Sequence, residues 1–372
     1  MYSSLLIFII AFFTIFFKFI NPVDGQSADS FQIPKIKFNP KNYICYRNNL
    51  PLKIDGKLDE SFWQKAEWTD DFVDIEGDLK PKPRFRTRVK MLWDNEYFYF
   101  AAEQEELDVW ANLTERDAVI FYDNDFEIFI DPDGDTHEYY EFEMNAFNTV
   151  WDLLLIKPYR DGGPAVNAWD IQGLKTGVFV DGTINQPRDK DRGWILEVAM
   201  PWKILKECAH RDAPPKNDDQ WRVNFSRVEW QLEVKDGKYS KIINLQTGKP
   251  FPEDNWVWSP QGLINMHYPE MWGYVQFSEK VAGEDKVEFQ FDPEENAKWA
   301  LRQIYYQQRN FFEEFGKFTD NLSDLNLEGL KVEEYNFLPI LKVTPNLFEA
   351  SLTSVVGDKE LFINQEGRII KK

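Results

Sequence analysis

Short runs in which polar and apolar residues alternate, separated by turn residues, dominate this sequence from Pro51 onward. The run Arg86–Trp93 is followed by the turn Asp94–Glu96 and then by the aromatic run Tyr97–Ala102. Side chains of a strand alternate between its two faces, so such a pair of runs predicts a β-hairpin. Many short strands at close spacing are typical of a sandwich or a barrel. We therefore predict an all-β fold, an antiparallel β-sandwich.

The same criterion predicts further strands. Asp125–Asp131 and Tyr139–Asn145 form a second hairpin around the turn Asp131–Asp135. The remaining expected strands are Thr149–Ile156, Leu174–Val180, Trp194–Ala199, Trp221–Glu229 and Tyr274–Phe277, and short helices are expected at Asp59–Ala66 and Pro201–Glu207.

The N-terminus indicates export. Leu5–Phe17 is almost entirely apolar and is short for a full membrane span. Residues 1–25 are therefore expected to be a signal peptide, with an uncleaved anchor as the alternative, because no basic residues precede the apolar run. Any membrane association is expected through this segment alone. The rest of the chain is expected to be periplasmic, on the cell surface or secreted.

The remainder divides by composition into a lead-in, residues 26–50, the sandwich, residues 51–280, and a polar linker, residues 281–293. Residues 294–372 are predicted to form a small C-terminal α+β extension. Its helix carries an apolar face that is expected to pack on the sandwich or on a partner, and its β-ribbon is expected at Phe348–Leu352 and Leu361–Ile370. The helical face consists of Ala297, Ala300, Leu301, Ile304, Gln308, Phe311, Phe312 and Phe315.

The charge balance limits the choice of partner. The chain has 43 Lys+Arg against 63 Asp+Glu, a formal net charge of -20. Such a charge repels phosphate backbones, so we expect no nucleic-acid partner. Neutral sugars and divalent cations remain compatible with it.

Few residues suit nucleophilic or zinc catalysis. The three histidines, His137, His210 and His267, stand in no hydrolase or zinc-site pattern, and no glycine-rich phosphate loop is present. The two cysteines, Cys45 and Cys208, are compatible either with a disulfide or with two buried free thiols.

Two local patterns suggest ligands. Asp131, Asp133 and Asp135 alternate in a turn and could supply oxygen ligands to calcium, although a solvated hairpin turn explains them equally. Trp256 and Trp258 share one side of an extended segment, which predicts either a platform for a sugar ring or core packing at a strand end.

Glu127 and Asn145 lie on the neighbouring strands of the second hairpin. Polar groups that point inward need partners. They would bind either the hydroxyls of a ligand or other groups of the protein.

Several segments together resemble the family 9 carbohydrate-binding modules, which are DOMON-like sandwiches. The resemblance covers about residues 51 to 278, and the order of the segments makes it specific. They are Ile54–Glu60 with Trp63, Val89–Asp94 with Tyr97–Phe100, Asp125–Asp131, Gly193–Trp202 and Trp272–Phe277. The chain looks closest to long, free-standing bacterial members of this group.

The resemblance implies structural calcium and a sugar held between two tryptophans by polar strand residues. The strand glutamate falls on Glu127 and a strand asparagine on Asn145. The first stacking tryptophan is replaced by Phe121 or Tyr122, and the second falls near Met266–His267. An arginine of the family's site appears here as Glu143. The resemblance therefore supports the fold more strongly than it supports a pair of aromatic rings that stack on the sugar.

We expect an exported, non-catalytic protein that binds an oligo- or polysaccharide for recognition or utilisation. The sequence singles out no catalytic acid pair among its many carboxylates. One alternative is an accessory or catalytic component of a glycoside hydrolase system. The other is a haem- or redox-binding DOMON relative, for which Met266 and His267 would be the ligand types.

Overall fold

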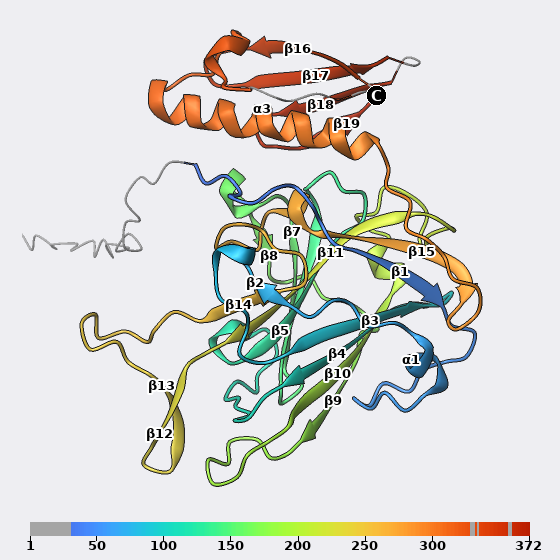
Figure 1. The fold of residues 1–372 in the computed structure, drawn as a ribbon, viewed down its shortest axis with the longest axis vertical. Helices are drawn as coiled ribbons and strands as arrows, with labels where there is room; N and C mark the ends of the chain where they lie inside the picture. The colour runs from blue at the N-terminus through green and yellow to red at the C-terminus, as the bar shows by residue number, and fades with distance from the viewer. Residues whose placement is uncertain (1–30, 328–331, 333–334, 356–358) are drawn as a thin grey trace, which may run out of the picture.

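A computed structural model describes residues 31–327, 332, 335–355 and 359–372 (Figure 1). The expected signal peptide or anchor, residues 1–25, lies outside the described residues. Within the described ranges, no helix has both the length and the apolar character that a membrane crossing requires.

Most of the described chain forms a β-sandwich, and the remainder forms a helix and a small sheet above it (Figure 1). The sandwich strands are β1 (Asn42–Arg47), β2 (Val73–Asp74), β3 (Thr87–Trp93), β4 (Tyr97–Glu105), β5 (Asp125–Asp131), β6 (Tyr139–Asn145), β7 (Val150–Leu155), β8 (Ala165–Val166), β9 (Lys175–Asp181), β10 (Gly193–Pro201), β11 (Gln220–Glu229), β14 (Asp254–Val257) and β15 (Gly273–Val281). The α-helices within it are α1 (Ser61–Lys65) and α2 (Trp202–Leu205).

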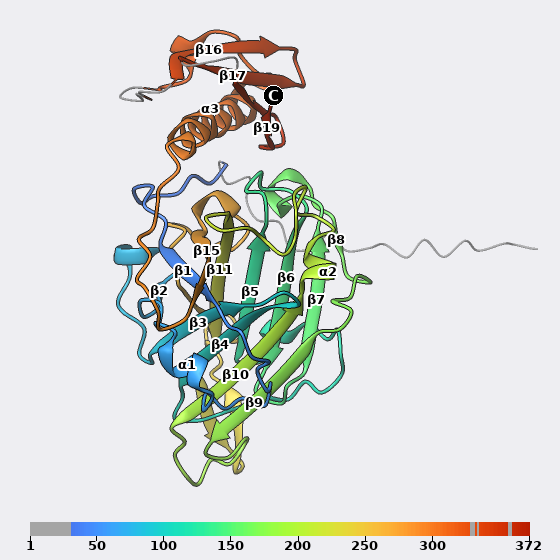
Figure 2. The same cartoon turned by 90° about the vertical axis from the view of Figure 1, so that its right-hand side faces the viewer.

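The strands follow one hydrogen-bonded path, β8-β7-β6-β5-β11-β15-β1-β3-β4-β10-β9, and β14 with β2 branches from β11. The path folds over so that β5, β6 and β11 lie across a common core from β3, β4 and β10 (Figure 2). Phe100 of β4 meets Phe225 of β11 there, with ring centroids 5.9 Å apart. Because Phe126 and Ile128 of β5 point into this core, Glu127 faces the opposite side of the sheet. The predicted all-β sandwich is confirmed.

One detail of the pairing differs from the prediction. β1 lies in the segment that we expected to be a lead-in, and it pairs in parallel with both β15 and β3. Its neighbours therefore come from distant parts of the chain, which a search for local hairpins does not reveal. The hairpin of β12 (Leu232–Lys235) and β13 (Lys238–Lys241) was also not predicted, although Asp236 and Gly237 form a typical hairpin turn between its strands, and it projects away from the sandwich (Figure 1).

Among its described residues, the C-terminal extension contains one α-helix, a short 3-10 helix and four strands. The predicted helix is α3 (Glu294–Phe315), and it ends at Gly316, whose φ of 67° suits glycine. The sheet has the order β16-β17-β18-β19, with bounds Tyr335–Val343, Phe348–Ser354, Glu360–Asn364 and Ile369–Lys371. The expected ribbon is therefore larger than predicted: β16 is added, and the second predicted run is divided between β18 and β19.

Helix α3 packs between its own sheet and the top of the sandwich (Figure 2). Tyr305 meets Phe31 edge to face at 5.5 Å, and Leu301 and Ile304 are fully buried in the same apolar cluster. Phe315, which we placed on the covered face, is instead 53% exposed because the helix extends past the apolar cluster.

Candidate functional site

A cavity of about 320 Å³ lies on the outer face of the sheet formed by β11, β5, β6 and β7. Its floor follows the cross-strand register: Glu127 of β5 lies opposite Glu143 of β6, and Glu143 lies opposite Trp151 of β7. Glu141 is two residues from Glu143 and therefore points to the same face.

Aromatic rings form part of the cavity wall. Phe121, in the short 3-10 helix Ile120–Tyr122, lies 6.4 Å from the ring of Trp151. Tyr159, from the 3-10 helix Tyr159–Asp161, lies 4.5 Å from the ring of His267. Flat rings above a polar floor are suited to a molecule with one apolar face and several polar groups.

Carboxylates dominate the polar lining. Glu127, Glu141 and Glu143 are almost fully buried, and Glu253 joins them from the segment before β14. Burial raises the pKa of Glu127 to about 7 and, together with the charge of Glu127, raises the pKa values of Glu141 and Glu143 well above their usual range. Among the described residues that line this cavity, none is a lysine or an arginine.

The histidine of the cavity does not compensate for this charge. Burial and the nearby Arg160 lower the pKa of His267 to about 3, so its ring is neutral. Arg160 follows Tyr159 in the chain, but its guanidinium is bound to Glu270 at 2.9 Å, beneath the C-terminal extension. Within the described part of the chain, no neighbouring cation therefore neutralises the carboxyl groups of the cavity when they ionise.

The structure brings three of the predicted site residues together, since Phe121, Glu127 and His267 all line this cavity. Tyr122 does not: it is 56% exposed and borders a separate depression beside β13. Asn145 is fully buried, donates hydrogen bonds to Leu113 O and Asp123 Oδ2, and accepts two more at Oδ1. Its amide is thus occupied within the protein, so its assignment to ligand hydroxyls is corrected.

The expected sugar platform at Trp256 and Trp258 is also corrected. Both side chains belong to the central core and are only 3% and 1% exposed, respectively. Trp258 packs directly on Gly273, where an added Cβ would lie 2.4 Å from the indole. The two rings do share one side of the segment, but that side faces the core and has no free face for a ligand.

The sequence did not predict Glu141, Trp151, Tyr159 or Glu253 as site residues. The alternation of Glu141 and Glu143 in a strand was a usable signal, because it places two carboxylates on one face. No comparable signal marked Tyr159 or Glu253, because loops bring both to the cavity.

The candidate calcium residues do lie together. Ligand oxygens of Asp131, Asp133 and Asp135 fall within 4.8 Å of one another. The carboxylate of Asp131 accepts hydrogen bonds from Gly134 N and Thr136 N, both at 2.9 Å. Asp135 is paired with Arg368 at 2.7 Å, which neutralises part of the charge. Three hard oxygen donors in one turn still fit calcium, with Arg368 as a competing cation.

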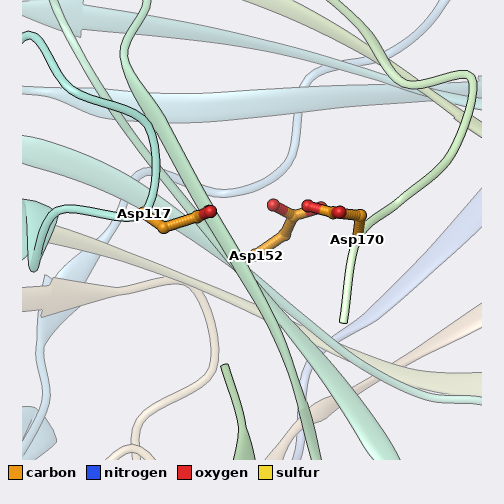
Figure 3. A group of neighbouring side chains, drawn as sticks. All are labelled: Asp117, Asp152 and Asp170. Atoms are coloured by element: carbon orange, nitrogen blue, oxygen red, sulfur yellow. The ribbon is translucent and has the colours of Figure 1, made fainter. Parts of the chain in front are cut away.

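Another acidic group, Asp117, Asp152 and Asp170, is shown in Figure 3. Asp152 and Asp170 lie side by side, and Asp117 points toward them. Arg116 forms ion pairs with all three carboxylates. An arginine therefore already balances the charge of this group, and we assign it no metal.

Two further predictions concern sulfur and haem. Cys45 and Cys208 are free and buried, in agreement with the alternative of two unpaired thiols. Met266 packs in an apolar cluster with Trp272, while His267 Nδ1 shares a 2.8 Å hydrogen bond with the hydroxyl of Tyr139. Both side chains therefore already contact other groups of the protein, and we do not propose haem binding.

A larger cavity of about 970 Å³ lies where the extension meets the sandwich. Its main charged groups already have partners, because Glu295 binds Arg222 and Asp135 binds Arg368. We therefore regard the smaller, aromatic cavity as the candidate site.

Comparison with known proteins identifies the fold family. The family described as "Carbohydrate family 9 binding domain-like" matches residues 54–218. Residues 54–218 of the sandwich form a domain similar to the family 9 carbohydrate-binding domains. The candidate cavity lies mostly on the strands of this domain and is completed by β11 and by the loop that ends at His267.

Two kinds of known proteins are similar to this chain. Exoglucanase XynX of Acetivibrio thermocellus is 23% identical over 152 residues, which cover 41% of this chain but only 12% of that enzyme. A family 9 carbohydrate-binding module of Caldicellulosiruptor kristjanssonii, solved with cellotriose and with glucose, is 15% identical. Its TM-scores are 0.42 and 0.41, and the alignments cover 67% of this chain and 99% and 100% of the solved chains.

Proposed function

We propose that this protein binds carbohydrate in the cavity above Glu127 and Glu143 and does not cleave it. The observation that carries the proposal is an aromatic-walled cavity with a polar floor in a chain with a family 9 domain. A pyranose has an apolar C–H face that can lie on Trp151 or Phe121. Its hydroxyls can donate hydrogen bonds to the carboxylates of the floor.

The test is titration calorimetry of the full chain with oligosaccharides. We expect Trp151→Ala and Phe121→Ala to weaken binding at least tenfold, since stacking surface in the cavity is removed. Tyr122→Ala is the matched control, because this ring neighbours Phe121 but does not line the cavity. Its affinity should be unchanged.

Two results would count against the proposal. One is an absence of binding to any mono-, oligo- or polysaccharide at millimolar concentration. The other is an equal loss of affinity in the Tyr122 and Phe121 variants. Release of reducing sugar by the purified protein would instead support the hydrolase alternative.

We further propose that the protein acts outside the cytoplasm, in the periplasm, on the cell surface or as a secreted polysaccharide-utilisation component. The apolar run Leu5–Phe17 supports this. N-terminal sequencing of the protein from the cell envelope and the medium tests it. A mature protein that begins near Gln26 is the expected result, whereas an intact N-terminus in the soluble cell extract would contradict export.

We also propose that Asp131, Asp133 and Asp135 hold a structural calcium ion. The proximity of the three carboxylates supports this proposal. Treatment with a chelator should lower the melting temperature of the wild type, and Asp133→Asn should reduce this sensitivity. An unchanged melting temperature, with no calcium detected by elemental analysis, would contradict the proposal.

A further inference from the structure

The cavity floor is more acidic than a site for neutral sugars requires. Glu127 and Glu143 face each other directly across two strands, an arrangement in which like charges destabilise a sheet. The remaining lining carboxylates, Glu141 and Glu253, add to the same charge.

Buried oxygens around the floor also lack partners. Both carboxylate oxygens of Asp125, two residues before Glu127 on the same face of β5, are buried without a hydrogen-bond donor, and so is Oε2 of Glu141. Ligand oxygens of Asp125, Glu127 and Glu143 lie within 4.8 Å of one another. A buried acceptor without a donor is unfavourable, so this part of the sheet lacks a cation or a set of donors.

We propose that the cavity is specific for saccharides that carry a free, protonated amine, that is, unacetylated amino sugars. This inference rests on the proposed function and names the class of sugar. An ammonium group supplies three donors and one positive charge to Glu127, Glu141 and Glu143. The sugar ring that carries the ammonium group can lie against Trp151 and Phe121. An N-acetyl sugar has a neutral acetamide in place of the ammonium group and therefore lacks the positive charge.

The aromatic lining favours an amine over a metal ion. Calcium takes six to eight oxygen ligands, whereas rings of Phe121, Trp151 and Tyr159 occupy much of this wall. Asp125, the third member of the compact carboxylate group, does not line the cavity. An organic cation can use both the rings and the carboxylates, since aromatic faces attract cations.

Titration calorimetry on the full chain tests the inference with three series matched in length: glucosamine, N-acetylglucosamine and glucose oligosaccharides. We expect the free amines to bind about tenfold or more tightly than the other two. Glu143→Gln should reduce this preference to within about twofold. The glutamine oxygen can still accept the hydrogen bond from Phe121 N that Glu143 accepts at 3.1 Å.

Glu141→Gln is the second variant, for use if Glu143→Gln does not fold. Glu233→Gln is the control for overall charge, because Glu233 is exposed on the projecting hairpin, outside the cavity. An equal loss of preference in Glu233→Gln would overturn the inference, because the preference for amines would then come from the net charge of the chain.

The outcomes also separate this inference from the proposed function. Equal affinity for all three series would overturn the amine preference while carbohydrate binding stands. An absence of binding to any series would remove both. A third outcome would also overturn the inference: the wild type binds glucose oligosaccharides only with calcium present, and Glu143→Gln removes this calcium dependence. The cation at the floor would then be a metal ion.

Discussion

Glu197 connects segments of the sandwich that are far apart in the sequence. Its carboxylate is fully buried and accepts hydrogen bonds from Asp55 N at 2.9 Å, Gly56 N at 2.7 Å and Trp63 Nε1 at 2.7 Å. Gly56 has a φ of 81°, and a Cβ there would lie 2.3 Å from Phe179 N. Two of the segments that resemble the family, Ile54–Glu60 with Trp63 and Gly193–Trp202, therefore meet at one carboxylate, away from the cavity.

Replacing Glu197 with alanine should lower the free energy of unfolding by about 3 kcal/mol or more. Three buried donors would lose their acceptor, at about 1–3 kcal/mol each before relaxation. Urea denaturation measures this change. Glu233→Ala, at an exposed position, is the control and should stay within about 0.5 kcal/mol of the wild type. Equal midpoints for both variants would show that Glu197 is not a structural anchor.

Individual residues show what the sequence could predict about the site. Phe121, Glu127 and His267 were found because the family resemblance fixes their places along the strands and loops. Alternation correctly put Trp256 and Trp258 on one side, but alternation alone does not say which side faces the core. Glu253 and Tyr159 were missed because their approach depends on loops, whose path local patterns do not encode.

At the scale of elements, local patterns succeeded and long-range pairing did not. β5 and β6 form a hairpin with strong alternation, and both have the predicted bounds. β1 is short, and its partner β15 lies more than 200 residues later in the sequence, so no local pattern predicted their pairing. α3 was visible from its apolar period, but the polar contacts that fix it to the sandwich were not.

A buried group of charged side chains fixes the first turn of α3 to the sandwich. Glu295 is buried and is bound by Arg222 at 2.6 Å, Lys298 at 2.7 Å and the hydroxyl of Tyr274 at 2.9 Å. Glu295→Gln should destabilise the protein by about 3 kcal/mol or more, because it leaves the buried Arg222 without its counter-charge. We expect a lower melting temperature and faster proteolysis within the extension.

Glu314→Gln, at an exposed position near the other end of α3, is the matched control and should behave like the wild type. If Glu295→Gln melts at the same temperature as this control, the ion pair at the junction does not hold the extension to the sandwich.

Across the whole molecule, two groups of buried acids have pKa shifts of opposite sign. In the cavity, burial raises the pKa of Glu127 to about 7. At the junction with the extension, burial alone would raise the pKa values of Glu270 and Glu295, but neighbouring arginines and Lys298 outweigh it and lower both to about 2. The two groups therefore respond to pH in opposite directions.

These shifts predict greatest stability at mildly acidic pH. Between about pH 4.5 and 7 the unfolded chain has released protons that Glu127 still holds in the folded state, so stability falls as the pH rises. Below about pH 4.5 the junction acids Glu270 and Glu295 become protonated first in the unfolded chain, so stability falls as the pH decreases. The net charge of -20 adds repulsion at neutral pH and acts in the same direction as the cavity acids.

Melting temperatures measured from pH 3 to pH 8 should therefore pass through a maximum near pH 5. Glu127→Gln should flatten the fall in melting temperature above this maximum. The corresponding change in the free energy of unfolding is up to about 3 kcal/mol, because one pKa unit corresponds to about 1.4 kcal/mol. Glu295→Gln should instead flatten the fall below it. A wild-type melting temperature that rises steadily to pH 8 would contradict the prediction. So would a Glu127→Gln profile parallel to that of the wild type, because the cavity acids would then ionise in the folded protein as readily as in the unfolded chain.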